Sequence, residues 1–106
     1  MRTKKYQDEL IRSLRDPLEA SKYLNAALEE KNTKIFLLAL RNVAKSFGGL
    51  PKISKKSGLN RENLYRMLSK KGNPEILSLK AVLKSVGLRL AVEIKNKHPK
   101  RTHIAA

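Results

Sequence analysis

The chain has 106 residues, no cysteine and a formal net charge of +15 at pH 7, from 24 Lys and Arg against 9 Asp and Glu. This length allows one compact domain with a modest core and short tails. The lack of cysteine excludes disulfides and cysteine-based metal sites. No apolar run approaches the roughly 20 residues that a membrane-spanning helix needs, and no apolar stretch follows the basic N-terminus as in a signal peptide. We therefore expect a cytoplasmic protein without a membrane partner.

The positive charge is concentrated in the second half of the chain. Residues 1–49 contain ten Lys and Arg and six Asp and Glu, whereas residues 50–106 contain fourteen and three. This excess favours a surface for a polyanion in the second half. A high charge also serves simply to keep a small protein soluble, so charge alone does not decide between the two.

Residues 1–15 predict an N-terminal arm. Tyr6, Leu10 and Leu14 recur at steps of four, and Leu18 continues the pattern. The stripe is too narrow for a self-sufficient helix face, but it suits an arm that packs on another surface. That surface is either the protein's own core or a partner protein.

Two helices are predicted next. Asp16-Pro17 is a typical helix start, and Glu19 completes the spacing of a capping box, so a helix should run to about residue 30. Thr33 should cap a second helix, which ends at the glycine pair 48–49. Its apolar residues recur at steps of three and four, and we interpret them as core rather than as a ligand pocket. They are Phe36, Leu40, Val43, Ala44 and Phe47.

The most informative pattern follows. A short helix over residues 50–57 should stop at Gly58, because glycine suits the left-handed position past a helix end. Asn60 can accept a hydrogen bond from an orphan backbone N–H and so cap a second helix over residues 61–68. Two short helices joined by a tight bend are typical of a helix-turn-helix, whose second helix enters the DNA major groove. Beneath them we expect an apolar floor of Ile53, Leu59, Leu64 and Met67.

The remaining residues predict a loop at 70–74, a helix over 75–86 and a basic disordered tail over 96–106. Residues 88–95 alternate between apolar and polar and predict a β-strand. A lone strand has no ladder partner in a helical protein, so we expect it to pair with the same strand of a second copy, or with a strand of a partner protein. Its apolar face, the expected dimerisation surface, comprises Leu88, Leu90, Val92 and Ile94.

Five segments also follow the order and spacing of a known family. They are YLNAALE (23–29), ALRNVA (39–44), SGLNRENLYR (57–66), GNP (72–74) and VLKSVGLRL (82–90). Together they resemble the addiction-module antidote proteins, HigA-like antitoxins with a helix-turn-helix of the phage-repressor (Xre) type. The resemblance covers about residues 6–95. It departs from the family at residues 49–51, where the family usually begins a helix with Met-Thr or Met-Ser, and in a longer basic tail.

The resemblance implies a mainly all-α fold: a phage-repressor-like bundle of about five helices with one C-terminal strand that pairs across a dimer. A single helix-turn-helix domain would then occupy residues 16–95. The implied function is that of a nucleoid-associated, sequence-specific DNA-binding antitoxin, which neutralises a RelE/ParE-like toxin and represses the operon that encodes both. The toxin would bind the N-terminal arm, through Tyr6, Leu10 and Leu14, or the edge of the strand. The alternative is a stand-alone phage-type repressor without a toxin.

Helix geometry predicts which side chains read DNA. Because Leu64 and Met67 must face inward, the polar residues near the start of the second helix are left exposed. Arginine pairs with guanine and asparagine with adenine, while Glu62 either accepts from cytosine or orients Arg66. Nearby lysines suit phosphates, or else form a solvated basic face; Tyr65 contacts DNA or covers the seam between the helices. The expected DNA-binding residues are Asn60, Arg61, Glu62, Asn63, Tyr65 and Arg66, together with Lys52, Lys55, Lys56, Lys70 and Lys71.

The other classes of function fit poorly. The two histidines, His98 and His103, lie in the predicted tail, where no catalytic base would be held in place, and their spacing does not suit a metal pair. No glycine-rich phosphate loop is present. We expect no enzyme, metal or cofactor. An RNA-binding or nucleoid-coating protein would fit the charge, but it leaves the helix-turn-helix spacing unexplained and would need more aromatic residues than the 5% present.

Overall fold

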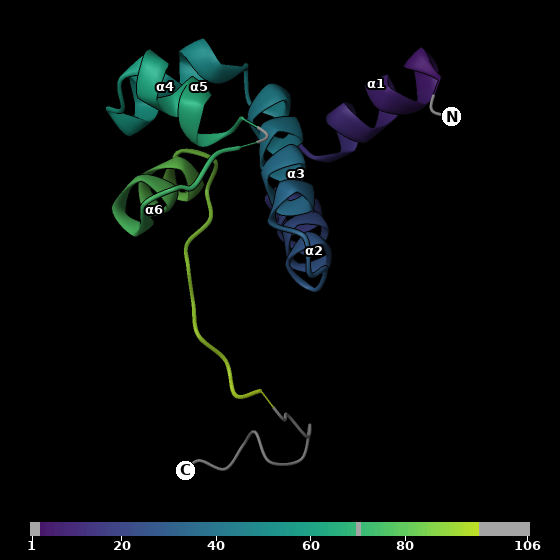
Figure 1. Ribbon diagram of the computed structural model, residues 1–106. Helices are drawn as coiled ribbons and strands as arrows, with labels where there is room; N and C mark the ends of the chain where they lie inside the picture. Colours follow the sequence, from purple (N-terminus) through teal and green to yellow (C-terminus); the bar gives the residue numbers. More distant parts are fainter. Residues whose placement is uncertain (1–2, 70, 96–106) are drawn as a thin grey trace.

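The computed structural model describes residues 3–69 and 71–95, and within them the protein consists of helices joined by short connections (Figure 1). The mainly α-helical fold is therefore confirmed. There are six helices in this part of the chain, one more than the predicted five. They are α1 (Lys4–Ser13), α2 (Pro17–Leu28), α3 (Thr33–Ser46), α4 (Leu50–Ser57), α5 (Arg61–Met67) and α6 (Ile76–Ser85).

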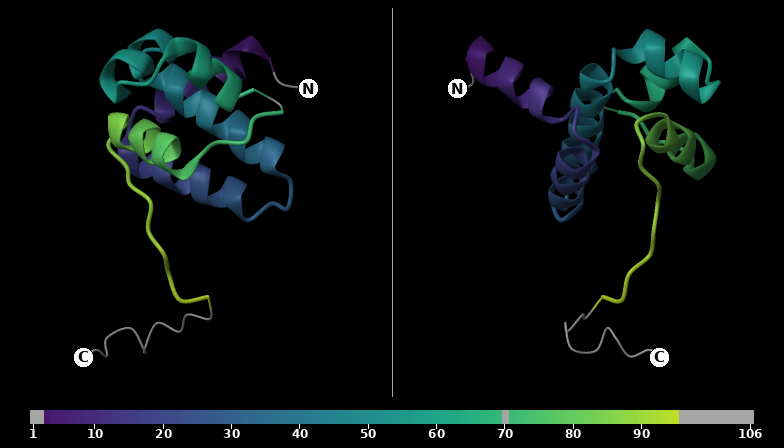
Figure 2. Two further views of the ribbon diagram at one scale, coloured as in Figure 1. Left: turned by 60° about the vertical axis from the view of Figure 1, so that its left-hand side comes forward. Right: turned by 180° about the vertical axis from the view of Figure 1, so that it is seen from behind.

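Helix α3 is the centre of the fold. It packs against α1, α2 and α4, with α1 on one side and α4, α5 and α6 on the other (Figures 1 and 2). Its predicted core residues are inside, except that Phe47 at its end is half-buried and packs against the core. The buried residues of α3 are Phe36, Leu37, Ala39, Leu40, Asn42, Val43, Ala44 and Ser46.

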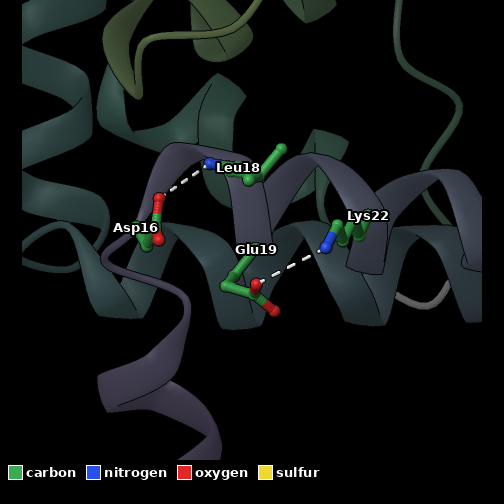
Figure 3. A network of polar contacts seen from close by, with 4 residues as sticks. All are labelled: Asp16, Leu18, Glu19 and Lys22. Atoms are coloured by element: carbon green, nitrogen blue, oxygen red, sulfur yellow. Dashed lines mark hydrogen bonds and ion pairs between the residues drawn. The ribbon is translucent and has the colours of Figure 1, made fainter.

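The starts of α2 and α3 differ in detail from the prediction. Asp16 caps α2 as expected, because its carboxylate accepts the backbone N–H of Leu18 at 3.0 Å. Glu19 does not complete a capping box but lies 3.8 Å from Lys22, one turn further along (Figure 3). The cap of α3 is Asn32 rather than Thr33, since Asn32 has the extended backbone of a cap while the following residue is already helical.

The N-terminal arm forms the additional helix. Thr3 caps α1 by accepting the backbone N–H of Tyr6 at 3.1 Å, and Leu10 packs partly against the core. No residue of α1 itself is fully buried, whereas Leu14, just after it, is 2% exposed. The step of four does not continue into α2, because the chain turns at Asp16 and leaves Leu18 60% exposed.

The predicted C-terminal strand was wrong for the single chain. Residues 88–94 have no regular secondary structure, and the described residues contain no strand. The physical reason is that a strand exists only within a ladder, and this helical chain supplies no second strand. The predicted tail, residues 96–106, lies outside the described residues. No helix in the described ranges is long and apolar enough to cross a bilayer.

Candidate nucleic-acid interface

The helix-turn-helix prediction concerns α4, α5 and the bend between them. Helix α4 ends at Gly58, whose φ of +79° is left-handed and whose N–H donates to the carbonyl of Ser54 at 2.9 Å. A Cβ at this glycine would meet nothing within 4 Å, so its conformation, and not the space around it, calls for glycine. The hydroxyl of Ser54 then donates to the carbonyl of Leu59 at 2.6 Å and fixes the turn from inside.

Asn60 begins α5 as predicted. Its side-chain oxygen accepts the backbone N–H groups of Glu62 and Asn63, at 2.8 and 3.1 Å. One side chain therefore satisfies two of the N–H groups that a helix start leaves without partners. Because these bonds occupy its oxygen, Asn60 acts first as a structural residue, and it is exposed beside the side chains expected to read DNA.

The inner face of α4 and α5 is the predicted apolar floor. Ile53 and Leu64 are 0% exposed and Met67 is 8% exposed. Leu59, in the turn, is half-buried and packs against the same core. This floor fixes the rotation of α5 about its axis, and so determines which of its side chains reach solvent.

The outer face of α5 is polar and exposed. Arg66 donates from Nη2 to the Oδ1 of Asn63 at 2.5 Å, which holds its guanidinium against the helix surface. Asn63, not Glu62, is therefore the residue that orients Arg66 in the free protein. Tyr65 is 49% exposed, so about half of its surface is open to solvent. The exposed residues of this face are Arg61, Glu62, Asn63, Tyr65 and Arg66.

The predicted phosphate-binding lysines surround this face. Lys52, Lys55 and Lys56 on α4 are exposed, as is Lys71 after α5. None of these four forms an ion pair with a carboxylate within the described residues, so their charges are not neutralised by the protein there. Lys70 lies outside the described residues.

Sequence reasoning assigned no role to Arg41, although it lies within the segment 39–44 that resembles the family. Arg41 lies on α3 and donates from Nη1 to the carbonyl of Leu68, the residue that caps the end of α5. A cation at this position donates to a carbonyl that the helix end leaves without a partner. Its positive charge is also stabilised by the negative, C-terminal end of the helix dipole. The only available signal was a charged residue inside an otherwise apolar pattern.

The loop after α5 approaches the same helix end closely. A Cβ at Gly72 would lie 2.0 Å from the carbonyl oxygen of Met67, a distance that no side chain tolerates. The N–H of Gly72 donates to the carbonyl of Ser69 at 2.9 Å. The loop can therefore pass this close to the end of α5 only because residue 72 has no side chain.

A buried amide was also not predicted. Asn42, 3% exposed, donates from Nδ2 to the hydroxyl of Tyr23 at 2.8 Å and accepts from the Nε2 of Gln7 at 3.3 Å. These bonds join α3 to α2 and to α1. Nothing in the apolar periodicity distinguishes such a residue from an exposed one.

The residues predicted to bind a toxin are distributed between surface and core. Tyr6 is 49% exposed and Leu10 is half-buried. Leu14 lies in the core, and its carbonyl accepts a hydrogen bond from the hydroxyl of Ser46 at 3.3 Å. Only the first half of α1 therefore presents these side chains to solvent.

Comparison with known proteins agrees with the resemblance seen in the sequence. The profile of a family described as probable addiction module antidote protein matches residues 5–94. An uncharacterised protein of Haemophilus influenzae is 35% identical over 75 residues, which cover 71% of this chain and 76% of that protein. No solved structure matches the chain.

Proposed function

Because the chain belongs to the probable addiction module antidote protein family, we propose that it is an antitoxin that binds operator DNA through α4 and α5. In this proposal it neutralises a RelE/ParE-like toxin encoded beside it and represses the operon that encodes both proteins. The observation that carries the DNA-binding part is the exposed polar face of α5, which has two arginines and an asparagine on a helix whose other face is buried.

The outer face of α5 has the chemistry of major-groove recognition. Arg61 stands at the first position of the helix, where side chains of a recognition helix reach base edges, and its guanidinium can pair with the two acceptors of a guanine. Arg66 and Asn63 form a second pair that is already oriented in the free protein. Glu62 can accept from the amino group of cytosine.

The exposed lysines suit the phosphates on both sides of the groove. Lys52, Lys55 and Lys56 project from α4, the helix that crosses the DNA backbone in a helix-turn-helix, and Lys71 follows α5. Their contacts would supply affinity but no sequence information. A helix-turn-helix protein reads two half-sites as a dimer, and we assign the dimer contact to residues 88–95.

The toxin-binding part of the proposal rests on family membership and on the position of α1. Figures 1 and 2 show α1 and α5 on opposite sides of α3, an arrangement that supports binding of both partners by one chain. We place the toxin contact on the exposed side of α1, around Tyr6. Leu14 supports this helix from the core and would contact no toxin.

Two measurements separate the parts of this proposal. The first is retention of DNA from upstream of the gene by the purified protein, and the second is rescue of growth when the neighbouring gene is expressed. The variant Arg61→Ala should lose operator retention but still rescue growth, whereas Tyr6→Ala should do the reverse. Lys22→Ala, on the exposed side of α2, is the matched surface control. Rescue that does not depend on α1 would place the toxin elsewhere, and a protein that binds all DNA sequences alike would contradict the repressor assignment.

A further inference from the structure

An open cleft lies between the start of α3 and the loop that follows α5. It has a volume of about 500 Å³. One wall is formed by residues 31–34 together with Leu37, and the other by Lys71 and Gly72. The cleft therefore connects a surface that has no assigned role to Lys71, which we place at the DNA backbone.

The side chains around this cleft are strongly positive. Lys31, Lys34 and Lys71 line it, and all three are exposed. None of the described residues that line the cleft carries a carboxylate, and none of the three lysines forms an ion pair within the described part of the chain. Three ammonium groups around one cleft repel each other, whereas an anion placed among them is attracted by all three.

The carboxylates closest in sequence lie outside this cleft. Glu29 and Glu30 precede Lys31, but neither lines the cleft, and Glu29 instead lines a different groove between α2 and residues 87–93. The charge of the whole chain changes at the same point. Residues 1–30 contain six Lys and Arg and six Asp and Glu, whereas residues 31–106 contain eighteen and three. The net charge of +15 therefore begins at Lys31, at one end of the cleft.

The cleft adjoins the outer face of α5. Lys71 and Gly72 also line a second cleft, of about 440 Å³, to which α5 contributes Asn63 and Arg66. The loop after α5 is thus a shared wall between the side chains proposed to read DNA and the lysines at the start of α3. A duplex that lies on α5 and contacts Lys71 comes next to Lys31 and Lys34.

DNA phosphate is the anion that suits this arrangement. Lysine binds phosphate as a point charge and needs no fixed geometry, so exposed lysines serve well along a backbone. The described residues that line the cleft include no aromatic side chain, and they offer no surface on which a nucleotide base could stack. The N-terminal end of the α3 dipole is positive and adds to the attraction for a phosphate.

Building on the DNA binding in the proposed function, we propose that Lys31 and Lys34 bind operator phosphates next to the phosphate bound by Lys71. Helix α3, whose other residues form the centre of the core, then belongs to the DNA interface at its N-terminal end. These contacts add affinity without sequence information, because every nucleotide carries the same phosphate.

The salt dependence of DNA binding tests this proposal, since each phosphate contact releases counterions. The wild type, Lys31→Ala, Lys34→Ala and the double variant are titrated with operator and scrambled DNA at several salt concentrations. We expect each single variant to reduce the slope of log K against log salt by about one unit and the double variant by about two, equally on both DNAs. An unchanged slope in the double variant would overturn the proposal.

Two further variants separate a local contact from a general effect of charge. Lys22→Ala removes one positive charge from the exposed side of α2, away from the cleft, and should leave the slope unchanged. Lys34→Arg keeps the charge at the cleft and should also keep the slope. If Lys22→Ala reduced the slope as much as Lys34→Ala, net charge and not the cleft would account for the effect.

Other occupants of the cleft give other results. Calorimetric titration with inorganic phosphate that saturates in the wild type and is lost in the double variant, with the DNA slope unchanged, would assign the cleft to a free anion. Weaker rescue of growth with an unchanged slope would assign it to the toxin. Either result would overturn the proposal.

These experiments fail differently from the proposed function. Arg61→Ala, titrated with the same DNAs, reports on base reading by α5. Loss of discrimination in Arg61→Ala, together with a wild-type slope in the double variant, would overturn the role of Lys31 and Lys34 alone. A wild-type protein that binds neither DNA would overturn both proposals. The substituted lysines are exposed, so urea denaturation of the same samples should confirm that each variant folds.

Discussion

Helix α3 and the segment 88–95 have equally regular apolar patterns, but most apolar side chains of α3 are buried in the folded chain, whereas most of those in the segment are exposed. The step of three and four in α3 is matched by α1, α2 and α4, and Leu40 and Val43 become fully buried. The step of two in the segment meets no second strand, and Val92 stays fully exposed. A periodic pattern predicts the conformation of a segment and its need for a partner, but not whether the partner belongs to the same chain.

The outer face of α5 belongs with the segment in this respect. Its arginines and asparagine are exposed, and the partner that we propose for them, DNA, is another molecule. Substitutions in α3 should therefore change folding, whereas substitutions in α5 or the segment should change association. The following experiments measure whether each substitution changes the stability of the fold or the binding of a partner.

The largest effect is expected in the centre of α3. Leu40→Ala removes a side chain that is 0% exposed and leaves a cavity, so the free energy of unfolding should fall by about 2–5 kcal/mol. Leu38→Ala is the matched control on the same helix, since Leu38 is 46% exposed, and it should cost much less. Urea denaturation of both variants measures the difference. Equal losses would mean that the outer side of α3 is also covered.

A smaller effect is expected where α3 holds the end of α5. Arg41→Ala removes a charged donor from the carbonyl of Leu68 and should lower the free energy of unfolding by about 1.5–3 kcal/mol. If the contact positions α5 for DNA, operator affinity measured well below the denaturation midpoint should fall as well. Arg41→Lys keeps the charge and should recover part of both. Lower stability with unchanged operator affinity would restrict Arg41 to a structural role.

Substitutions on the outer surface should affect binding but not folding. Arg61→Ala should weaken operator binding by about 1–3 kcal/mol and blur discrimination at one base position in each half-site. Lys55→Ala should weaken all sequences alike and reduce the salt dependence by about one unit of slope. Titrations on operator and scrambled DNA at several salt concentrations distinguish the two. Unchanged specificity in Arg61→Ala would mean that another side of α5 faces the bases.

The smallest effect on folding is expected in the segment itself. Val92→Ala should change the free energy of unfolding of the monomer by less than about 0.5 kcal/mol, because the side chain contacts nothing that folding buries. The same variant should weaken the dimer. Denaturation at low protein concentration, where the monomer dominates, isolates the first quantity. A large loss there would show that Val92 packs against its own chain.

Local sequence rules predicted much of α4, α5 and the turn between them. Gly58 and Asn60 adopt the left-handed and capping roles that their chemistry favours, and Ile53 and Leu64 lie on the buried face that the spacing indicates. These features depend on residues close together in the chain. Prediction was weaker where two distant segments meet, because spacing within one segment does not reveal its tertiary neighbours.

The contacts of Arg41 and Asn42 illustrate that limit. Arg41 bonds to a carbonyl 27 positions away, and Asn42 bonds to side chains 35 and 19 positions away. Both residues merely interrupt an apolar pattern in the sequence. The prediction of a strand over residues 88–95 was wrong for a different reason. The alternation of apolar and polar residues is present in the sequence, but a strand also needs a second strand to pair with, and the described part of this chain contains none.

Helix α1 has a consequence for local opening. It buries no residue completely, and its contacts with the rest of the protein include the partly buried Leu10 and the bond between Gln7 and Asn42, so its detachment uncovers only the edge of the core. Opening of such a unit costs less free energy than global unfolding. In hydrogen exchange the amides of α1, and that of Leu14, which donates to the carbonyl of Leu10, should therefore lose protection before the amides of α3.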